Sequence, residues 1–249
     1  KTLNIALAGT GVGKSLFMCH LASSYLLQGL NVLYITLEMA EERIAERIDA
    51  NLLDVTMEDL HDMPQQLYEG KITKLREKTQ GQLVIKEYPT ASAHSGHFKS
   101  LMNELALKKS FRPDVIFIDY LNICASSRFK GGNISSYFYV KAIAEELRGL
   151  AVEFNVPIFS ATQTTRTGYV STDIGLEDTS ESFGLPATAD FMFALISNEE
   201  LEALGQMKVK QLKNRYNDPS INRAFIIGVD RAKMRLYDVQ QKAGEIVDA

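Results

Sequence analysis

Residues 3–15 read LNIALAGTGVGKS, and this stretch decides the fold of the chain. An apolar run of strand length is followed by three closely spaced glycines, and a long helical pattern begins at the lysine and serine. Strand, glycine-rich loop and helix in this order form the phosphate-binding pattern G-x-x-x-x-G-K-[ST], with Ala8 in place of the first glycine. A chance GKS in a glycine-rich turn is the alternative, and the flanking strand and helix argue against it.

The chemistry of this loop follows from its residue types. Gly9, Gly11 and Gly13 allow the backbone to wrap closely, so that several N–H groups point at phosphate oxygens. The N-terminus of the next helix adds a favourable dipole. Lys14 is expected to reach the β- and γ-phosphates of ATP, and the Ser15 hydroxyl is expected to bind Mg²⁺. The predicted nucleotide-binding residues are Ala8, Gly9, Thr10, Gly11, Val12, Gly13, Lys14, Ser15 and Leu16.

Beyond this loop, short β-rich runs alternate with longer helical stretches, which is the α/β pattern of a mostly parallel sheet flanked by helices. The predicted strands are Leu3–Ala8, Val32–Leu37, Leu83–Glu87, Val115–Ile118, Pro157–Ala161 and Asp190–Ile196. The predicted helices are Lys14–Gln28, Ala40–Leu53, Gln65–Gln80, Phe98–Lys109 and Tyr137–Phe154. Three later runs with short connections predict a C-terminal antiparallel extension of the sheet: Met207–Leu212, Ala224–Val229 and Met234–Val239.

The composition is that of one globular domain. The 249 residues are 45% hydrophobic and 23% charged, and they suffice for one sizeable core. The formal net charge is −4, so contact with nucleic acid is expected from a local basic patch. Two cysteines in apolar segments fit a reducing compartment, and we find no signal peptide and no membrane-spanning run. Because the first strand starts at residue 3, we expect that an upstream region is missing.

Two carboxylates are predicted to lie beside the phosphate loop. Asp119 ends the apolar run of RPDVIFIDY, where an aspartate would hold Mg²⁺ through a water molecule. Tyr120 stands where many ATPases carry the general base, but a tyrosine is a poor base at neutral pH. Glu38 ends a strand on the same sheet edge and would polarise the attacking water. The alternative for Glu38 is an acid that favours the dipole of the following helix.

Other polar residues near strand ends are less specific. Gln163 follows the predicted strand Pro157–Ala161, where an amide can sense the γ-phosphate and act on the next loop. An ordinary polar residue that opens a loop fits the same pattern equally well. His94 and His97 have no metal-ligand partners nearby in the sequence, and we interpret them as loop residues.

The phosphate loop, ITLEM, VIFIDYL, SATQ and a late KNR together resemble the DnaB-type replicative DNA helicases of the RecA superfamily. The resemblance covers nearly the whole chain. It is greatest to the T-even-type bacteriophage members, in segments such as NVLYI, EMAEE, RIDAN, AIAEELR and GLPATADFM. It implies that residues 1–249 are a single RecA-like C-terminal ATPase domain, without the N-terminal primase-interacting domain and linker of the family.

The resemblance implies roles for five residues. Glu38 corresponds to the catalytic glutamate of the family, and Gln163 to its γ-phosphate sensor. Arg47 matches an arginine near the nucleotide whose task stays open, with a solvated helix face as the alternative. Lys213 and Arg215 match a pair that reaches the ATP of the neighbouring subunit, where an arginine finger neutralises transition-state charge. For this pair the alternative is a basic hairpin tip exposed to water.

A helicase of this type implies contacts with the backbone of single-stranded DNA in a central channel. Two connections that follow strand ends, residues 125–136 and 164–176, carry turn residues and basic side chains. The candidate DNA-binding residues are Arg128, Lys130, Gly131, Arg166 and Gly168. Solvated loops without a ligand are the alternative.

The favoured hypothesis is a replicative helicase motor that couples ATP hydrolysis to 5′–3′ translocation on single-stranded DNA as a ring hexamer. The alternatives are a RecA-like strand-exchange ATPase and a clock-protein-like oligomeric ATPase without DNA. The KNR pair and Glu38 favour the helicase over strand exchange. The resemblance also implies ATP and Mg²⁺ as cofactors, a primase and a helicase loader as partners, no membrane, and a phage protein in the cytoplasm of the bacterial host.

Overall fold

The computed structural model describes residues 1–129, 134–165, 174–179, 184–218 and 220–240. In this part of the chain nine strands form one sheet, in the order β3-β2-β4-β5-β1-β6-β7-β8-β9. Their bounds are β1 Leu3–Ala8, β2 Val32–Thr36, β3 Leu83–Glu87, β4 Val115–Asp119, β5 Ile158–Gln163, β6 Phe191–Ile196, β7 Gln206–Asn214, β8 Ala224–Asp230 and β9 Arg235–Asp238. Strands β1 to β6 pair in parallel, and β7, β8 and β9 pair antiparallel. The predicted fold class is confirmed.

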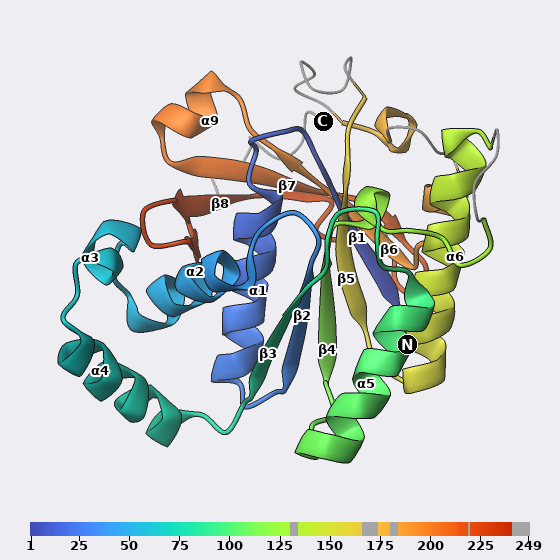
Figure 1. Cartoon of the computed structure of the whole chain (residues 1–249). Helices are drawn as coiled ribbons and strands as arrows, with labels where there is room; N and C mark the ends of the chain where they lie inside the picture. Colours follow the sequence, from blue (N-terminus) through green and yellow to red (C-terminus); the bar gives the residue numbers. More distant parts are fainter. Residues whose placement is uncertain (130–133, 166–173, 180–183, 219, 241–249) are drawn as a thin grey trace.

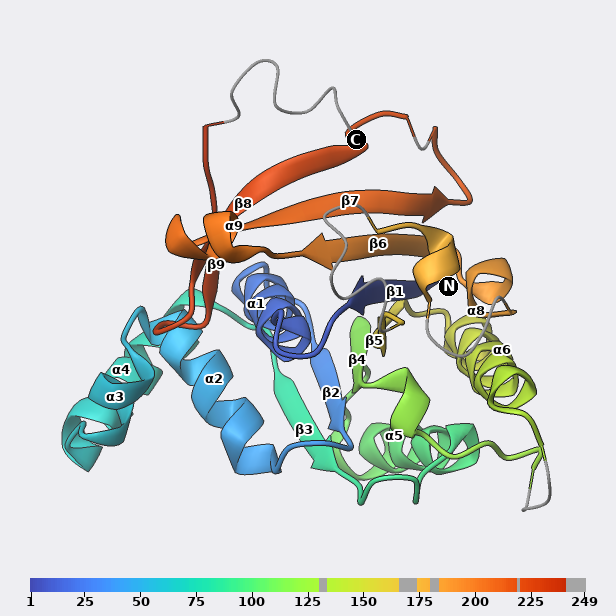
Figure 2. The ribbon, with the colours of Figure 1, turned by 90° about the horizontal axis from the view of Figure 1, so that it is seen from above.

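Helices cover both faces of the parallel part of the sheet. The described helices are α1 Lys14–Leu27, α2 Glu41–Leu53, α3 Met57–His61, α4 Gln65–Lys78, α5 Ser95–Lys109, α6 Ser136–Phe154, α8 Gly184–Thr188 and α9 Glu199–Ala203, with 3₁₀ turns η1 Leu121–Ile123 and η2 Leu176–Asp178. Figure 1 and Figure 2 show α1 and α2 on one face, and α5 and α6 on the other. No described helix has the length and apolarity that crossing a membrane requires.

The central strands are buried along their whole length because helices lie on both sides of them. Every residue of β1, β2 and β4 is buried. Parallel pairing aligns the ends of these strands, with Thr36 level with Asp119 and Ala8 level with Gln163. The segments that follow β1, β2, β4 and β5 therefore emerge at one edge of the sheet, which is where open α/β sheets bind ligands.

The structure differs from the sequence prediction at several element ends. Helix α5 begins at Ser95, three residues before the predicted start at Phe98, because the His94 side chain accepts a hydrogen bond from the Gly96 N–H. The interpretation of His97 as a loop residue was wrong, since it lies in the first turn of α5. Helices α3 and α8 were not predicted, and β5 extends beyond Ala161 to Gln163.

Candidate active site

The glycine-rich loop between β1 and α1 has the backbone geometry that its sequence predicts. Gly11 and Gly13 have φ angles of 79° and 125°, in the region that glycine enters at low cost. Helix α1 begins at Lys14, directly after Gly13, so the free N–H groups of its first turn face the loop. An anion in the loop would meet these donors and the positive end of the helix dipole.

Lys14 is held inside the loop. Its side chain is buried, with 8% exposed, and Nζ donates a hydrogen bond to Gly9 O at 3.2 Å. Burial lowers the pKa of Lys14 below its ordinary value. The carboxylates of Glu38 and Asp119 act in the opposite direction and offset part of this effect. Within the described residues Lys14 makes no ion pair closer than 4 Å, so a bound phosphate would supply the partner that the ammonium lacks.

Asp119, at the end of β4, is fully buried and held from one side only. The Tyr34 hydroxyl donates a hydrogen bond to Asp119 Oδ2 at 3.0 Å, whereas Oδ1 has no hydrogen-bond partner among the described residues. Burial raises the pKa of Asp119, and the hydroxyls of Ser15 and Tyr34 act in the opposite direction. An unpartnered carboxylate oxygen in a buried position is costly unless a ligand satisfies it.

These residues fit a magnesium ion. Mg²⁺ prefers oxygen ligands and is usually held by one or two protein groups together with phosphates and waters. The free Oδ1 of Asp119 and the hydroxyl of Ser15 are such groups. Among the described residues no cluster of three His, Cys, Asp or Glu side chains could hold a metal by itself.

One cavity of about 350 Å³ brings most of the predicted residues together. Thr10, Gly11, Gly13, Lys14, Ser15, Leu16, Glu38, Arg47 and Gln163 all line it, with Met39, Arg231 and Met234. Glu38 is exposed and follows β2, and Arg47 is half-buried on α2, which is against a fully solvated helix face. Ala8 is buried in β1 and does not line the cavity. A larger apolar cavity of about 640 Å³, between α1 and strands β5 to β8, contains none of these residues.

Gln163 is connected to Lys14 through Tyr120. Gln163 Nε2 donates a hydrogen bond to the Tyr120 hydroxyl at 3.0 Å, and Lys14 Nζ lies 5.8 Å from the centre of the Tyr120 ring. A cation at this distance from an aromatic face is attracted to it. Tyr120, which stands where many ATPases carry the general base, therefore contacts both the candidate sensor and the phosphate-binding lysine.

Arg231 is a site residue that sequence reasoning missed. It lies between β8 and β9, and its Nη2 donates a hydrogen bond to Val12 O in the phosphate loop at 3.2 Å. The two residues are 219 positions apart in the sequence, and no motif surrounds Arg231. The antiparallel extension was predicted, but the sequence carries no local signal for the contact that it makes with the phosphate loop through Arg231.

Lys213 and Arg215 lie at the opposite end of the strands from the phosphate loop. Val209 on β7 is level with Ala8 through Leu195, and β7 runs from there away from the loop. Lys213 is therefore roughly 13 Å further along the strand, at about 3.4 Å per residue. Neither Lys213 nor Arg215 lines the candidate nucleotide cavity of its own chain.

The candidate DNA-binding residues are only partly described. Arg128 forms an ion pair with Glu145, and its segment is fixed by Glu146, whose carboxylate accepts hydrogen bonds from Ser126 Oγ at 2.6 Å and from the Ser127 N–H. The other candidates lie outside the described residues: Lys130, Gly131, Arg166 and Gly168.

The chain is similar in sequence to known replicative DNA helicases. The replicative helicase of Enterobacteria phage T4, described as DnaB-like, is 49% identical over 243 residues, which cover 96% of this chain and 51% of that protein. A probable plasmid replicative DNA helicase of Chlamydia trachomatis is 32% identical over 168 residues, covering 65% of this chain and 35% of its own length. The chain thus spans about half or less of the curated relatives it matches.

Solved structures share the fold. One of them, described as an ATPase domain, has a TM-score of 0.78 at 16% identity and covers 96% of this chain and 85% of that one. A DnaB-like replicative helicase, described together with its interactions with primase, has the same TM-score and identity and covers 96% and 57%. The family model described as "DnaB-like helicase C terminal domain" matches residues 1–232. The chain belongs to the family of DnaB-like helicase C-terminal domains.

Proposed function

We propose that this chain is the ATP-hydrolysing motor domain of a replicative DNA helicase. The observation that carries the proposal is the gathering of Lys14, Ser15, Glu38 and Gln163 around one cavity, with the unpartnered oxygen of Asp119 beside it. The chain covers 51% of the length of the T4 relative, so the proposal concerns the motor domain and not every activity of a replicative helicase.

The cis chemistry follows from these residues. The loop N–H groups and Lys14 bind and neutralise the β- and γ-phosphates of ATP, while Ser15 and Asp119 hold Mg²⁺, which offsets the charge that develops on the phosphates. Glu38 is exposed to the cavity and orients a water molecule for attack on the γ-phosphate. Gln163 senses the γ-phosphate and transmits its loss through Tyr120 and β5.

The catalytic charge is completed in trans. Lys213 and Arg215 lie too far from the phosphate loop of their own chain, but a head-to-tail arrangement presents them to a neighbour. An arginine finger contributes on the order of 10³–10⁵-fold in turnover. A closed ring would place every finger at a neighbouring site, and we propose a ring of six copies because of the resemblance to DnaB-type helicases.

Single-stranded DNA is the proposed track. The loops that follow β4 and β5 begin next to Asp119 and Gln163, so a change at the γ-phosphate reaches them directly. Arg128 supplies one candidate contact, and Lys130, Gly131, Arg166 and Gly168 are the others. Translocation is proposed in the 5′–3′ direction, with a primase and a helicase loader as partners, in the cytoplasm of a phage-infected host.

The test is the effect of single-stranded DNA on ATP turnover by the assembled full-length protein. A helicase motor predicts a several-fold rise in kcat on DNA and ATP-dependent unwinding of a forked duplex. An unchanged rate would remove the helicase function and leave the oligomeric ATPase without DNA. Strand pairing that persists with a non-hydrolysable ATP analogue would instead favour the strand-exchange ATPase.

A further inference from the structure

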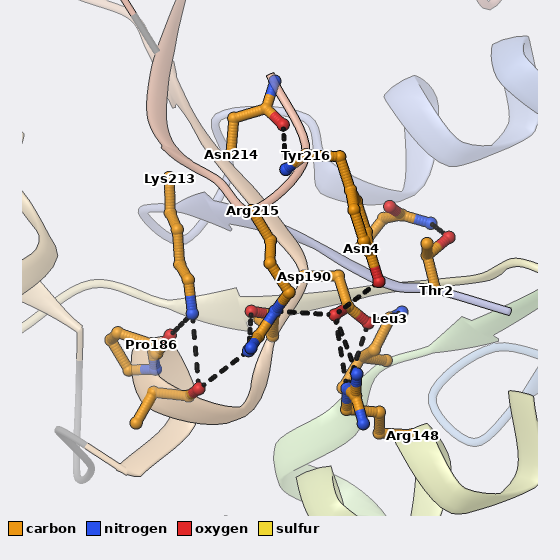
Figure 3. Close-up of polar contacts among 12 residues, drawn as sticks. Thr2, Leu3, Asn4, Arg148, Pro186, Asp190, Lys213, Asn214, Arg215 and Tyr216 are labelled. Atoms are coloured by element: carbon orange, nitrogen blue, oxygen red, sulfur yellow. Dashed lines mark hydrogen bonds and ion pairs between the residues drawn. The ribbon is translucent and has the colours of Figure 1, made fainter. Parts of the chain in front are cut away.

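A buried carboxylate lies behind the proposed finger. Asp190, directly before β6, is fully buried, and its partners come from three separate segments of the chain (Figure 3). One of these partners is Arg215, whose Nε lies 2.9 Å from Asp190 Oδ1. The backbone follows the same pairing, since the Arg215 N–H donates to Asp190 O at 2.9 Å.

The contacts of Arg215 occupy one edge of its guanidinium group. Nε faces Asp190, and Nη2 donates to Ala187 O at 3.2 Å and to Ala189 O at 3.4 Å. Within the described residues Nη1 makes no hydrogen bond or ion pair, and the side chain is 40% exposed. Lys213 is held beside it, with Nζ donating to Pro186 O at 2.5 Å.

Asp190 is itself held rigidly. Arg148 of α6 forms a forked contact, with Nε and Nη2 each 3.1 Å from a carboxylate oxygen, and the Leu3 N–H of β1 donates to Oδ2 at 3.0 Å. The Tyr216 hydroxyl donates to Oδ1 at 3.3 Å. Burial acts to raise the pKa of Asp190, but the Leu3 N–H and the two arginines outweigh it, so the pKa lies below its ordinary value.

We propose that Asp190, locked by Arg148, is the positioning residue of the finger: it fixes one edge of Arg215 so that the other edge is presented to the nucleotide of the neighbouring subunit. The inference rests on the proposed trans role of Arg215. It adds a residue that does not touch the nucleotide and affects turnover at the neighbouring site through the guanidinium that it holds.

The physical reason is the entropy of a long side chain. A free arginine samples many rotamers, and ordering it when the transition state forms costs free energy at that moment. A planar guanidinium that is already fixed along one edge loses less freedom when its other edge binds phosphate. A buried carboxylate is suited to this task, because solvent weakens its attraction for the arginine less than it would for a carboxylate at the surface.

A second role of Asp190 must be separated from this one. Through Leu3 it also ties the start of β1 to β6, so its replacement could lower activity simply by loosening the sheet. A loosened sheet impairs the site of the same subunit. A misplaced finger impairs only the site of the neighbour. Complementation between subunits distinguishes the two.

The experiment uses mixed assemblies of the full-length protein and measures ATP turnover without DNA. Lys14→Ala subunits have an inactive nucleotide site and an intact finger. Arg215→Ala subunits have an intact nucleotide site and no finger. Their mixture should recover turnover that neither has alone, and this sets the reference. Asp190→Asn alone should lower kcat by about 10–100-fold, with the KM for ATP nearly unchanged. Mixed with Lys14→Ala subunits it should recover to the reference level.

Arg148→Gln provides a second variant that leaves the buried carboxylate in place, in case Asp190→Asn fails to fold. It should show a smaller loss of kcat that Lys14→Ala subunits also repair. Asp114→Asn is the control, because Asp114 likewise accepts a backbone N–H, that of Asn31 at 2.8 Å, but contacts no finger residue. It should keep wild-type turnover.

The outcomes separate the proposal from the function on which it rests. Turnover that recovers when Lys14→Ala subunits are mixed with Arg215→Ala, but not when they are mixed with Asp190→Asn or Arg148→Gln, would overturn the positioning role. It would leave the trans finger intact. No recovery in the reference mixture would contradict the trans finger itself, and the proposal with it. Normal kcat in Asp190→Asn would show that Arg215 needs no such support.

Discussion

At the scale of single residues, the candidate site depends on side chains that hold other side chains. Tyr34 is buried at the centre of β2, and its hydroxyl occupies one oxygen of Asp119 and leaves the other for a metal. Asp190 plays a comparable part for Arg215 at the opposite sheet edge. In both cases the group that would meet the ligand is directed by a partner that sequence motifs do not mark.

Replacing Tyr34 by phenylalanine tests the first of these pairs. Without the hydroxyl the Asp119 carboxylate is free to turn and loses a stabilising donor, which raises its pKa further. We expect half-maximal ATP turnover to need several-fold more Mg²⁺, and stability to fall by about 1–3 kcal/mol for the lost hydrogen bond to a charged group. Tyr25→Phe, in the same aromatic cluster but away from Asp119, is the control. An unchanged Mg²⁺ titration in Tyr34→Phe would contradict this arrangement.

The acid stability of the chain should report on Asp190. Its pKa in the folded protein lies below the ordinary 3.8, so its ionised form stabilises the fold. That contribution is complete above pH 3.8 and is lost as the pH falls through the folded pKa. Melting temperatures of wild type and Asp190→Asn should therefore differ near neutral pH and converge below pH 3.8. A difference that stays constant in acid would show that the charge of Asp190 does not stabilise the fold.

At the scale of elements, α6 anchors the start of one candidate DNA loop. Glu146 on α6 accepts hydrogen bonds from Ser126 and Ser127 after η1, and from Ser95 Oγ at 2.8 Å. Burial acts to raise the pKa of Glu146, and the hydrogen bonds from these serines lower it below its ordinary value. The helix, the loop and the start of α5 are thus joined at one carboxylate.

Replacing Glu146 by glutamine weakens this anchor without touching the nucleotide cavity. We expect several-fold weaker binding of single-stranded DNA, measured by fluorescence anisotropy, while ATP turnover in the absence of DNA stays near wild type. Glu153→Gln is the matched control, since Glu153 lies on the same helix and pairs with Lys99 at the surface. Equal loss in both variants would mean that the anchor has no specific role in DNA binding.

The elements also show what a sequence can predict. The phosphate loop, β4 with Asp119, and β2 with Glu38 were predictable because each motif is continuous and its strand is apolar throughout. Helix α3 was missed although Thr56 and Asp59 form a capping box, which is a sequence signature of a helix N-terminus. Helix α8 was missed because its sequence, GLPAT, contains glycine and proline and spans a single short turn.

Contacts between distant segments were not predictable. The contacts of Tyr34 with Asp119, of Arg231 with Val12, and of Asp190 with Arg215 join distant segments, which the pairing of the whole sheet brings together. The resemblance to DnaB-type helicases implied the roles of Gln163, Lys213 and Arg215, which the residue pattern alone left open. The sequence had no signal for the partners that hold these residues in place.

At the scale of the whole molecule, the phosphate loop and the finger pair lie at opposite ends of the sheet. Two substitutions should distinguish the role of the phosphate loop from that of the finger pair. Arg215→Ala should lower ATP turnover by on the order of 10³-fold or more while nucleotide binding stays largely intact. Lys14→Ala should abolish turnover and weaken binding as well, because Lys14 lies in the phosphate loop. Binding is measured with a fluorescent ATP analogue, and an equal loss of binding in both variants would argue against a trans role.

The reversal of direction at β7 has a consequence for symmetry. In a head-to-tail series the finger pair of each subunit would face the phosphate loop of the next subunit. Such a series either closes into a ring or ends in two unequal subunits. In an open series the phosphate loop of one terminal subunit would meet no finger, so under the proposed trans role that subunit would bind ATP but hydrolyse it slowly.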